Sequence, residues 1–146
     1  MRWTPPVPSS AVRVNETVET VVIDASVLVD LLAGTDYAAP ATARLRGTTL
    51  HAPAHLDAEV LSALGRLHRA GELRAADIGA ALARLASLPL TRHLLTDLLV
   101  GAWEHRASVR LVDGLYVHLA SRLDVPLLTT DRRLARACPS AELITG

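Results

Sequence analysis

The sequence predicts an α/β protein, a three-layer sandwich in which helices cover both faces of a central, mainly parallel sheet. Short apolar runs, such as residues 20–24 and 126–130, alternate along the chain with longer stretches whose leucines recur at helical spacing. Strands that are separated by helices favour parallel pairing, because a parallel connection needs a crossover of about a dozen residues or more. The 146 residues, 50% of them hydrophobic, suffice for one domain with its own core.

The elements follow one another in a regular order. Residues 20–24 are β-branched and predict a buried strand, and residues 26–32 predict a short helix that Gly34 ends. Leucines at helical spacing predict a pair of helices around the turn at Gly71, which together form a helical hairpin. The other elements are a weak strand at 48–52, the hairpin helices at 55–70 and 75–88, a strand at 89–93, helices at 94–105 and 113–123, a strand at 126–130, a short helix at 132–137 and an edge strand at 142–145.

Composition limits the classes of function. The proline- and serine-rich residues 1–18 predict a disordered tail, which leaves residues 19–146 as the domain. No apolar run is long enough for a membrane span or a secretion signal, and the single cysteine, Cys138, cannot form an internal disulfide, so we expect a cytoplasmic protein. Net charge is zero, and with two Trp, two Tyr and no Phe, base stacking on aromatic side chains is not expected to be the main mode of recognition.

Four acidic residues stand where a hydrophobic segment meets a turn or a helix start: Asp24, Glu59, Asp113 and Asp131. A carboxylate at the end of a buried strand costs free energy unless it meets a cation or hydrogen-bond donors. Ligand sites of open α/β sheets lie beyond the carboxyl ends of the strands, so Asp24 and Asp131 are expected to share one edge. Helix starts would bring Glu59 and Asp113 to the same rim. Four such oxygen ligands predict a site for Mg²⁺ or Mn²⁺ and not for zinc.

Each acid taken alone also has a structural explanation. Asp113 and Asp131 could be helix N-caps, and Glu59 could be a solvated helix residue. Asp24 is the hardest to explain structurally, because a buried strand has no structural need for a carboxylate at its end. Ser26 and Thr130 flank the candidates and are expected to support a carboxylate through their hydroxyl groups, with Asp30 as a further neighbour. The set indicates a site more strongly than any single member does.

The acids lie in four short motifs. Residues 21–32 read Val-Val-Ile-Asp-Ala-Ser-Val-Leu-Val-Asp-Leu-Leu, residues 56–60 Leu-Asp-Ala-Glu-Val, residues 111–120 Leu-Val-Asp-Gly-Leu-Tyr-Val-His-Leu-Ala and residues 127–131 Leu-Leu-Thr-Thr-Asp. In their order and spacing, over residues 20–145, they resemble the motifs of PIN-domain ribonucleases of the VapC toxin type. One departure is Gly114, where that family more often has alanine.

The resemblance implies a PIN-like fold and a Mg²⁺-dependent endoribonuclease, with Mn²⁺ as a possible substitute, that acts as the toxin of a toxin–antitoxin pair. Asp24, Glu59, Asp113 and Asp131 would be the catalytic, metal-binding acids. RNA would be the substrate, a cognate antitoxin the partner, and the usual assembly a homodimer. Alternatives are an RNA-processing nuclease outside toxin–antitoxin systems and a metal-free PIN-like scaffold. Another class of enzyme uses its own strand-end aspartate as a phosphoryl acceptor and needs a lysine beside it. All fifteen basic residues here are arginines, which argues against this class.

Two further surfaces are predicted from the pattern. Arg132, Arg133 and Arg136 are candidates for gripping the RNA backbone, with a solvated helix face as an equally good explanation. The hairpin carries more apolar surface than a small sheet needs, and we predict that part of it forms a groove for a second copy or for the antitoxin. Its apolar residues are Leu64, Leu67, Ile78, Leu82 and Leu85. We assign structural or surface roles to the six histidines and core or dimer contacts to Trp103 and Tyr116. Cys138 has no nearby base in the sequence that would make it a nucleophile.

Overall fold

The computed structural model describes residues 2–4 and 17–146, so most of the predicted tail at 1–18 lies outside the described residues. Five strands form one sheet in the order β3-β2-β1-β4-β5, and every neighbouring pair is parallel. The predicted parallel sheet is therefore confirmed. The strands are β1 (Thr20–Ile23), β2 (Thr49–Pro53), β3 (Leu90–His93), β4 (Leu127–Thr129) and β5 (Ala141–Leu143).

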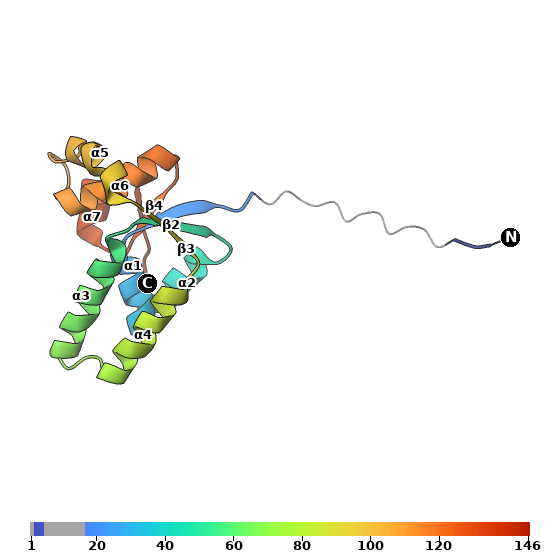
Figure 1. The fold of residues 1–146 in the computed structure, drawn as a ribbon, viewed down its shortest axis with the longest axis horizontal. Coiled ribbons are helices and arrows are strands. Elements are labelled where there is room, and N and C mark those ends of the chain that lie inside the picture. Colours follow the sequence, from blue (N-terminus) through green and yellow to red (C-terminus); the bar gives the residue numbers. More distant parts are fainter. Residues whose placement is uncertain (1, 5–16) are drawn as a thin grey trace.

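Helices cover both faces of this sheet, which confirms the three-layer sandwich (Figure 1). One face carries α1 (Ala25–Ala33), α2 (Ala38–Leu45), α3 (Leu56–Arg69) and α4 (Ala75–Ser87); the other carries α5 (Leu99–Glu104), α6 (Leu111–Leu123) and α7 (Arg132–Ala137). Helices α3 and α4 form the predicted hairpin, which projects from the body of the molecule. No helix within the described part of the chain is long and apolar enough to cross a membrane.

The chain changes direction across the sheet at β1. Strands β2 and β3 follow on one side of β1, and β4 and β5 on the other. Such a switch point leaves a crevice at the carboxyl ends of the two central strands. Asp24 directly follows β1, and Asp131 follows β4 after one further residue. The topology thus brings these two acids to one place, as the sequence predicted.

The core uses more of the hairpin than the sequence suggested. Leu64 and Leu85 are buried in the main core, and Leu67, Ile78 and Leu82 pack partly buried against it. Most of the apolar surface that we predicted to be available for a partner at these positions therefore packs against the core of the same chain.

Two elements differ from the prediction. Residues 38–45, for which the sequence analysis predicted no helix or strand, form α2. Pro40 is the third residue of α2, where its missing amide would have had no partner within the helix. The helix expected at 94–105 is instead a 3-10 turn, Leu95–Asp97, followed by α5. The break lets Leu98 enter the core while Leu94 and Leu99 stay exposed.

Candidate active site

All four predicted acids line one cleft at the carboxyl edge of the sheet. The cleft has a volume of about 260 Å³, and Asp24, Glu59, Asp113 and Asp131 all contribute to its wall. We call it the acidic cleft. Ser26 and Asp30 from α1, Arg66 from α3 and Arg110 from the start of α6 complete its polar lining.

Asp24 is the most constrained of the four. It is only 7% exposed and caps α1, where its Oδ1 accepts a hydrogen bond of 3.1 Å from the backbone amide of Ser26. A structural reason for a carboxylate after β1 therefore does exist, contrary to our expectation from the sequence. Burial raises the pKa of Asp24, and the nearby Asp113 carboxylate adds to the rise, while donors from Thr129 and Ser26 oppose it. The cap explains one oxygen, but not why a buried charge is kept there.

The hydroxyl that holds Asp24 most closely belongs to Thr129. Its Oγ1 donates to Asp24 Oδ2 at 2.6 Å, and Ser26 Oγ donates to the same oxygen at 3.0 Å. The register explains this arrangement, because β1 and β4 pair Ile23 with Leu128 and so set the next residues, Asp24 and Thr129, side by side. The sequence analysis had expected Thr130 to support a carboxylate of the site. Its hydroxyl instead donates a hydrogen bond of 2.6 Å to Asp30, while its backbone amide donates one to Ser26 Oγ.

Glu59 reaches the cleft from the first turn of α3 and is held by two aromatic rings. The Tyr116 hydroxyl donates to Glu59 Oε1 at 2.6 Å, and His55 Nε2 lies 3.0 Å from the same oxygen without the alignment of a hydrogen bond. Partial burial alone would raise the pKa of Glu59, but the neighbouring His55 and Tyr116 outweigh it and hold the pKa below its usual value. Tyr116 is a core residue, as expected, and its hydroxyl gives it a second role that the sequence did not indicate.

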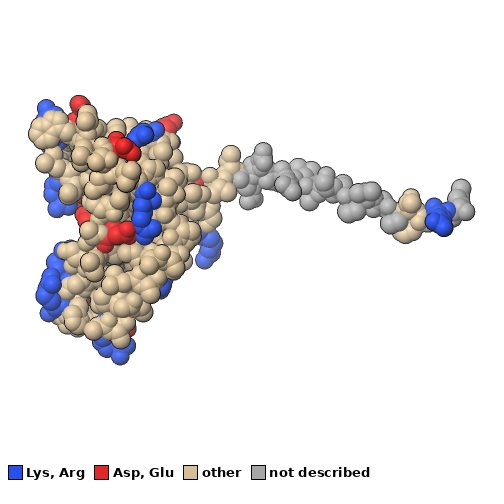
Figure 2. Space-filling view, viewed as in Figure 1, with Lys and Arg blue, Asp and Glu red and all other residues tan. Residues whose placement is uncertain are grey.

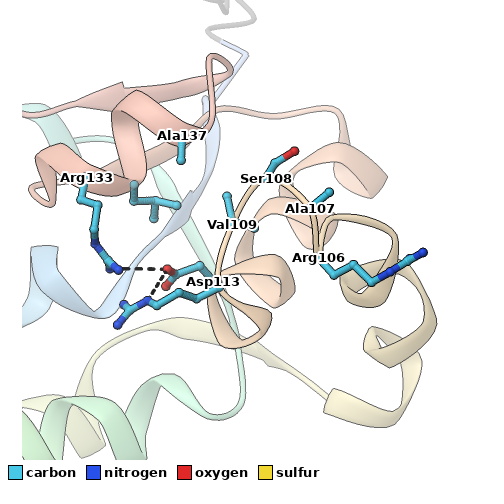
Figure 3. A pocket seen from close by; sticks show the side chains of 9 residues that line it. Arg106, Ala107, Ser108, Val109, Asp113, Arg133 and Ala137 are labelled. Carbon is cyan, nitrogen blue, oxygen red and sulfur yellow. Dashed lines mark hydrogen bonds and ion pairs between the residues drawn. The ribbon is translucent and has the colours of Figure 1, made fainter.

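Asp113 is buried but does not cap α6. The helix begins at Leu111, so Asp113 lies in its first turn, and no side-chain cap is formed there. Its Oδ2 accepts a hydrogen bond of 3.0 Å from Arg110 Nε and lies 3.6 Å from Arg133 Nη2 (Figure 3). The simple N-cap explanation thus fails for Asp113.

Gly114, next to Asp113, is explained by packing between helices. A Cβ atom at this position would lie 2.8 Å from the carbonyl oxygen of Ala102 in α5, closer than real contacts allow. The departure from alanine at Gly114 therefore lets α5 approach α6 beside the acidic cleft.

Asp131 does cap a helix. Its Oδ1 accepts hydrogen bonds from the backbone amides of Arg133 and Leu134 at the start of α7, and its Oδ2 accepts one from the Arg133 guanidinium at 3.2 Å. Burial alone would raise the pKa of Asp131, but these donors prevail and lower it. Asp131 therefore combines a structural role with a place in the wall of the cleft.

The donor set suits a hard divalent cation. The four acids offer only carboxylate oxygens, two of the carboxylates are buried, and no cysteine lines the cleft. As the side chains stand, however, no three His, Cys, Asp or Glu residues in the described part of the chain are arranged to hold a metal ion. Asp113 and Asp131 instead face Arg110 and Arg133. A metal at this site would have to replace guanidinium groups as the partners of these carboxylates.

The three arginines nominated for RNA binding all lie on α7 and are exposed. Only Arg133 reaches the acids; within the described residues, Arg132 and Arg136 form no ion pair. Arg110 and Arg66 also line the cleft, and the sequence analysis missed both because neither stands in one of the acidic motifs. The face shown in Figure 2 carries small acidic and basic areas side by side, which agrees with the zero net charge.

Comparison with known proteins identifies a family and relatives of this chain. The family model described as "PIN domain" matches residues 21–138, which contain all four acids. The chain is 58% identical over 127 residues to Ribonuclease VapC3 of Mycobacterium tuberculosis, which covers 86% of this chain and 93% of the relative. It is 38% identical over 117 residues to Ribonuclease VapC12 of the same species, covering 80% and 91%.

A solved structure shares the fold. The crystal structure of PAE2754 from Pyrobaculum aerophilum superposes with a TM-score of 0.62 at 23% identity, over 93% of this chain and 91% of the other. This likeness supports the architecture alone.

Proposed function

The chain belongs to the PIN-domain family, within the VapC ribonucleases, and from this premise we propose that it is a Mg²⁺-dependent endoribonuclease that acts as the toxin of a toxin–antitoxin pair. The observation that carries the proposal is the acidic cleft, in which four carboxylates from four different elements line one wall around the buried Asp24. Two of these four acids, Glu59 and Asp113, cap no helix. A cytoplasmic location, where RNA is available, is part of the same proposal.

The metal would be held by Asp24, Glu59, Asp113 and Asp131. Bound there, Mg²⁺ or Mn²⁺ would supply Lewis-acid catalysis by polarising the scissile phosphate and lowering the pKa of the attacking water. The Thr129 and Ser26 hydroxyl groups fix the Asp24 carboxylate in one orientation, so that no reorganisation of this group is needed during the reaction.

Glu59 is the carboxylate that we propose to take the proton from the attacking water. Its Oε1 accepts the Tyr116 hydroxyl, whereas its Oε2 has no hydrogen-bond donor among the described residues. The lowered pKa keeps Glu59 ionised near neutral pH, as a general base must be. The free oxygen can therefore orient a water molecule and accept its proton.

The partners are proposed from two apolar surfaces. A groove of about 500 Å³ on the hairpin, lined by Leu61, Leu82, Leu85, Ala86, Asp57 and Arg92, suits the antitoxin. Leu64, which the sequence analysis assigned to this groove, is buried and cannot contact a partner. We propose that Leu61, which is 54% exposed, makes the main contact with the antitoxin instead. The exposed residues Leu99, Val100, Trp103, Leu111 and Val112 of α5 and α6 suit a homodimer contact.

Cleavage of RNA by matched variants tests the proposal. The wild-type protein should cut RNA in the presence of Mg²⁺ or Mn²⁺ and not in EDTA, and Asp24→Asn should reduce the rate by about 100-fold or more. Glu142→Gln is the control, because it also neutralises one acid but lies in β5 outside the acidic cleft. The same Asp24→Asn change should relieve growth inhibition on expression.

Three results would count against the proposal. Undiminished cleavage by folded Asp24→Asn would exclude the acidic cleft as the active site. No cleavage and no metal binding by the wild type would favour a metal-free scaffold. Metal-dependent cleavage without growth inhibition would favour an RNA-processing nuclease.

A further inference from the structure

A second cavity adjoins the acidic cleft. It has a volume of about 340 Å³ and lies between the loop before α6 and helix α7 (Figure 3). Arg110 and Asp113 line both hollows, so this pair of residues forms the wall between them. A ligand that occupied both hollows would pass directly over Arg110.

One wall of this cavity is cationic. Arg110 and Arg133 both form ion pairs with Asp113, and Figure 3 shows Arg133 pointing toward it; each uses only part of its guanidinium there. Arg110 donates through Nε and Arg133 through Nη2, so within the described residues both Nη groups of Arg110 and the Nε and Nη1 groups of Arg133 have no acceptor. Arginine donors of this kind match the oxygens of a phosphodiester group.

The rest of the cavity is apolar with one hydroxyl group. Val109, Leu134 and Ala137 provide the apolar surface, and Ser108 lies on the same loop. Arg106 also borders the cavity, but its side chain points away in Figure 3 and lies over the Trp103 ring, 4.7 Å from its centre. A cavity lined by both arginines and aliphatic residues suits a nucleotide, with its phosphate on the arginines and its base on the aliphatic residues.

We propose that this cavity binds the RNA nucleotide adjacent to the cleaved bond, with Arg110 and Arg133 holding its phosphate. The inference rests on the proposed ribonuclease function and extends it with a substrate subsite and two positioning residues. It also explains why arginines stand among the proposed catalytic acids: they neutralise Asp113 and Asp131, while their unused guanidinium donors remain available to RNA. A single-stranded RNA passing from cleft to cavity is favoured over a protein ligand, because the cavity adjoins the proposed site of cleavage across Arg110 and Asp113.

Binding of short RNA in EDTA tests the subsite without any cleavage. The ligands are 5′-phosphorylated mono-, di- and trinucleotides and a glutamate tetrapeptide, titrated against Arg110→Gln, Arg133→Gln and the double variant. Arg84→Gln is the control, because it removes one exposed arginine from the last turn of α4. Arg84 lines neither the acidic cleft nor the second cavity. Affinity is measured over a range of salt concentrations.

The wild type and Arg84→Gln should bind the dinucleotide more tightly than the mononucleotide. Arg110→Gln and Arg133→Gln should each bind the dinucleotide about tenfold more weakly than the wild type. Each variant should also reduce the slope of log affinity against log salt by about 0.7, the value for one lost phosphate contact on a single strand. Arg110→Lys should keep most of the slope and lose affinity, because the charge remains without the planar fork. If Arg110→Gln does not fold, Arg133→Gln and Arg110→Lys still test the subsite.

Equal dinucleotide affinity and salt slope in wild type, Arg133→Gln and Arg110→Lys would overturn the subsite. Preferential binding of the glutamate peptide, lost in the same variants, would overturn it in favour of a protein ligand. Both outcomes are independent of the metal-dependent cleavage assay, so the subsite can fail while the proposed function stands.

Discussion

Two clusters of arginine and acidic residues in this molecule differ in burial and in charge balance. In the first, which we call the Arg44 cluster, Arg44 of α2 pairs with Glu19 before β1 at 2.8 Å and with Glu142 of β5 at 2.5 Å. The acidic side chains there are 47% and 46% exposed. In the acidic cleft, Asp113 faces Arg110 and Arg133 with a side chain that is only 8% exposed, and Asp24 is buried beside it.

The difference separates the Arg44 cluster, which has a structural role, from the acidic cleft, which is the candidate functional site. Exposed ion pairs contribute little free energy, and the Arg44 cluster serves to connect α2 with the two strands. Buried carboxylates are unfavourable unless something satisfies them, and two of the four carboxylates around the acidic cleft are buried. Burial, more than the number of ion pairs, is therefore the basis of our proposal that the acidic cleft is a functional site.

The largest effect on stability is expected from Thr129→Val. This change keeps the shape but removes the buried hydroxyl that donates to Asp24 and accepts the amide of Asp131. The Asp131 amide then loses its acceptor and Asp24 Oδ2 keeps only the Ser26 hydroxyl as donor, which should lower the free energy of unfolding by about 1–3 kcal/mol. Glu142→Gln, which breaks one exposed pair of the Arg44 cluster, should cost about 1 kcal/mol or less. Urea denaturation in EDTA measures both, and equal losses would remove the distinction between the clusters.

A smaller effect is expected from Tyr116→Phe. The ring stays in the core, but Glu59 loses the hydroxyl donor at 2.6 Å, with a stability loss of about 1 kcal/mol. Because that hydroxyl helps to hold the pKa of Glu59 low, its removal should raise this pKa. Cleavage should then fall off at a higher pH on the acid side than in the wild type. An unchanged pH profile would argue against Glu59 as the general base.

The smallest effect concerns the stability of the metal-free protein. The pKa of Asp24 is raised in the folded state, mainly by burial, so the folded protein holds this proton more tightly than the unfolded chain. Stability is therefore lost as pH rises from the unfolded pKa through the folded one. Asp24→Asn removes this loss and should raise the thermal midpoint at pH 7, with the gain shrinking toward pH 4. A lower midpoint at pH 7 in EDTA would show that the charged form stabilises the fold.

The sequence predicted the parallel sheet, the hairpin and the four acids that line the cleft, because strand-end and helix-start positions follow from local patterns. It did not identify Thr129 as the partner of Asp24, since that contact depends on the register between β1 and β4. Helix α2 was not predicted; its Pro40 is compatible with a helix because it lies in the first turn, where its missing amide needs no partner. Arg110 was missed because only the fold shows which side chain shields Asp113.

Calorimetric titration of the metal-free protein with Mn²⁺ tests the central claim that the acidic cleft is a metal site. Wild type and Glu142→Gln should bind Mn²⁺ with the same affinity, whereas Asp24→Asn should bind at least about tenfold more weakly. Arg110→Gln should bind more tightly than wild type, because the cation that faces Asp113 has been removed. Equal Mn²⁺ affinity in wild type and Asp24→Asn, or no binding by the wild type, would contradict the account.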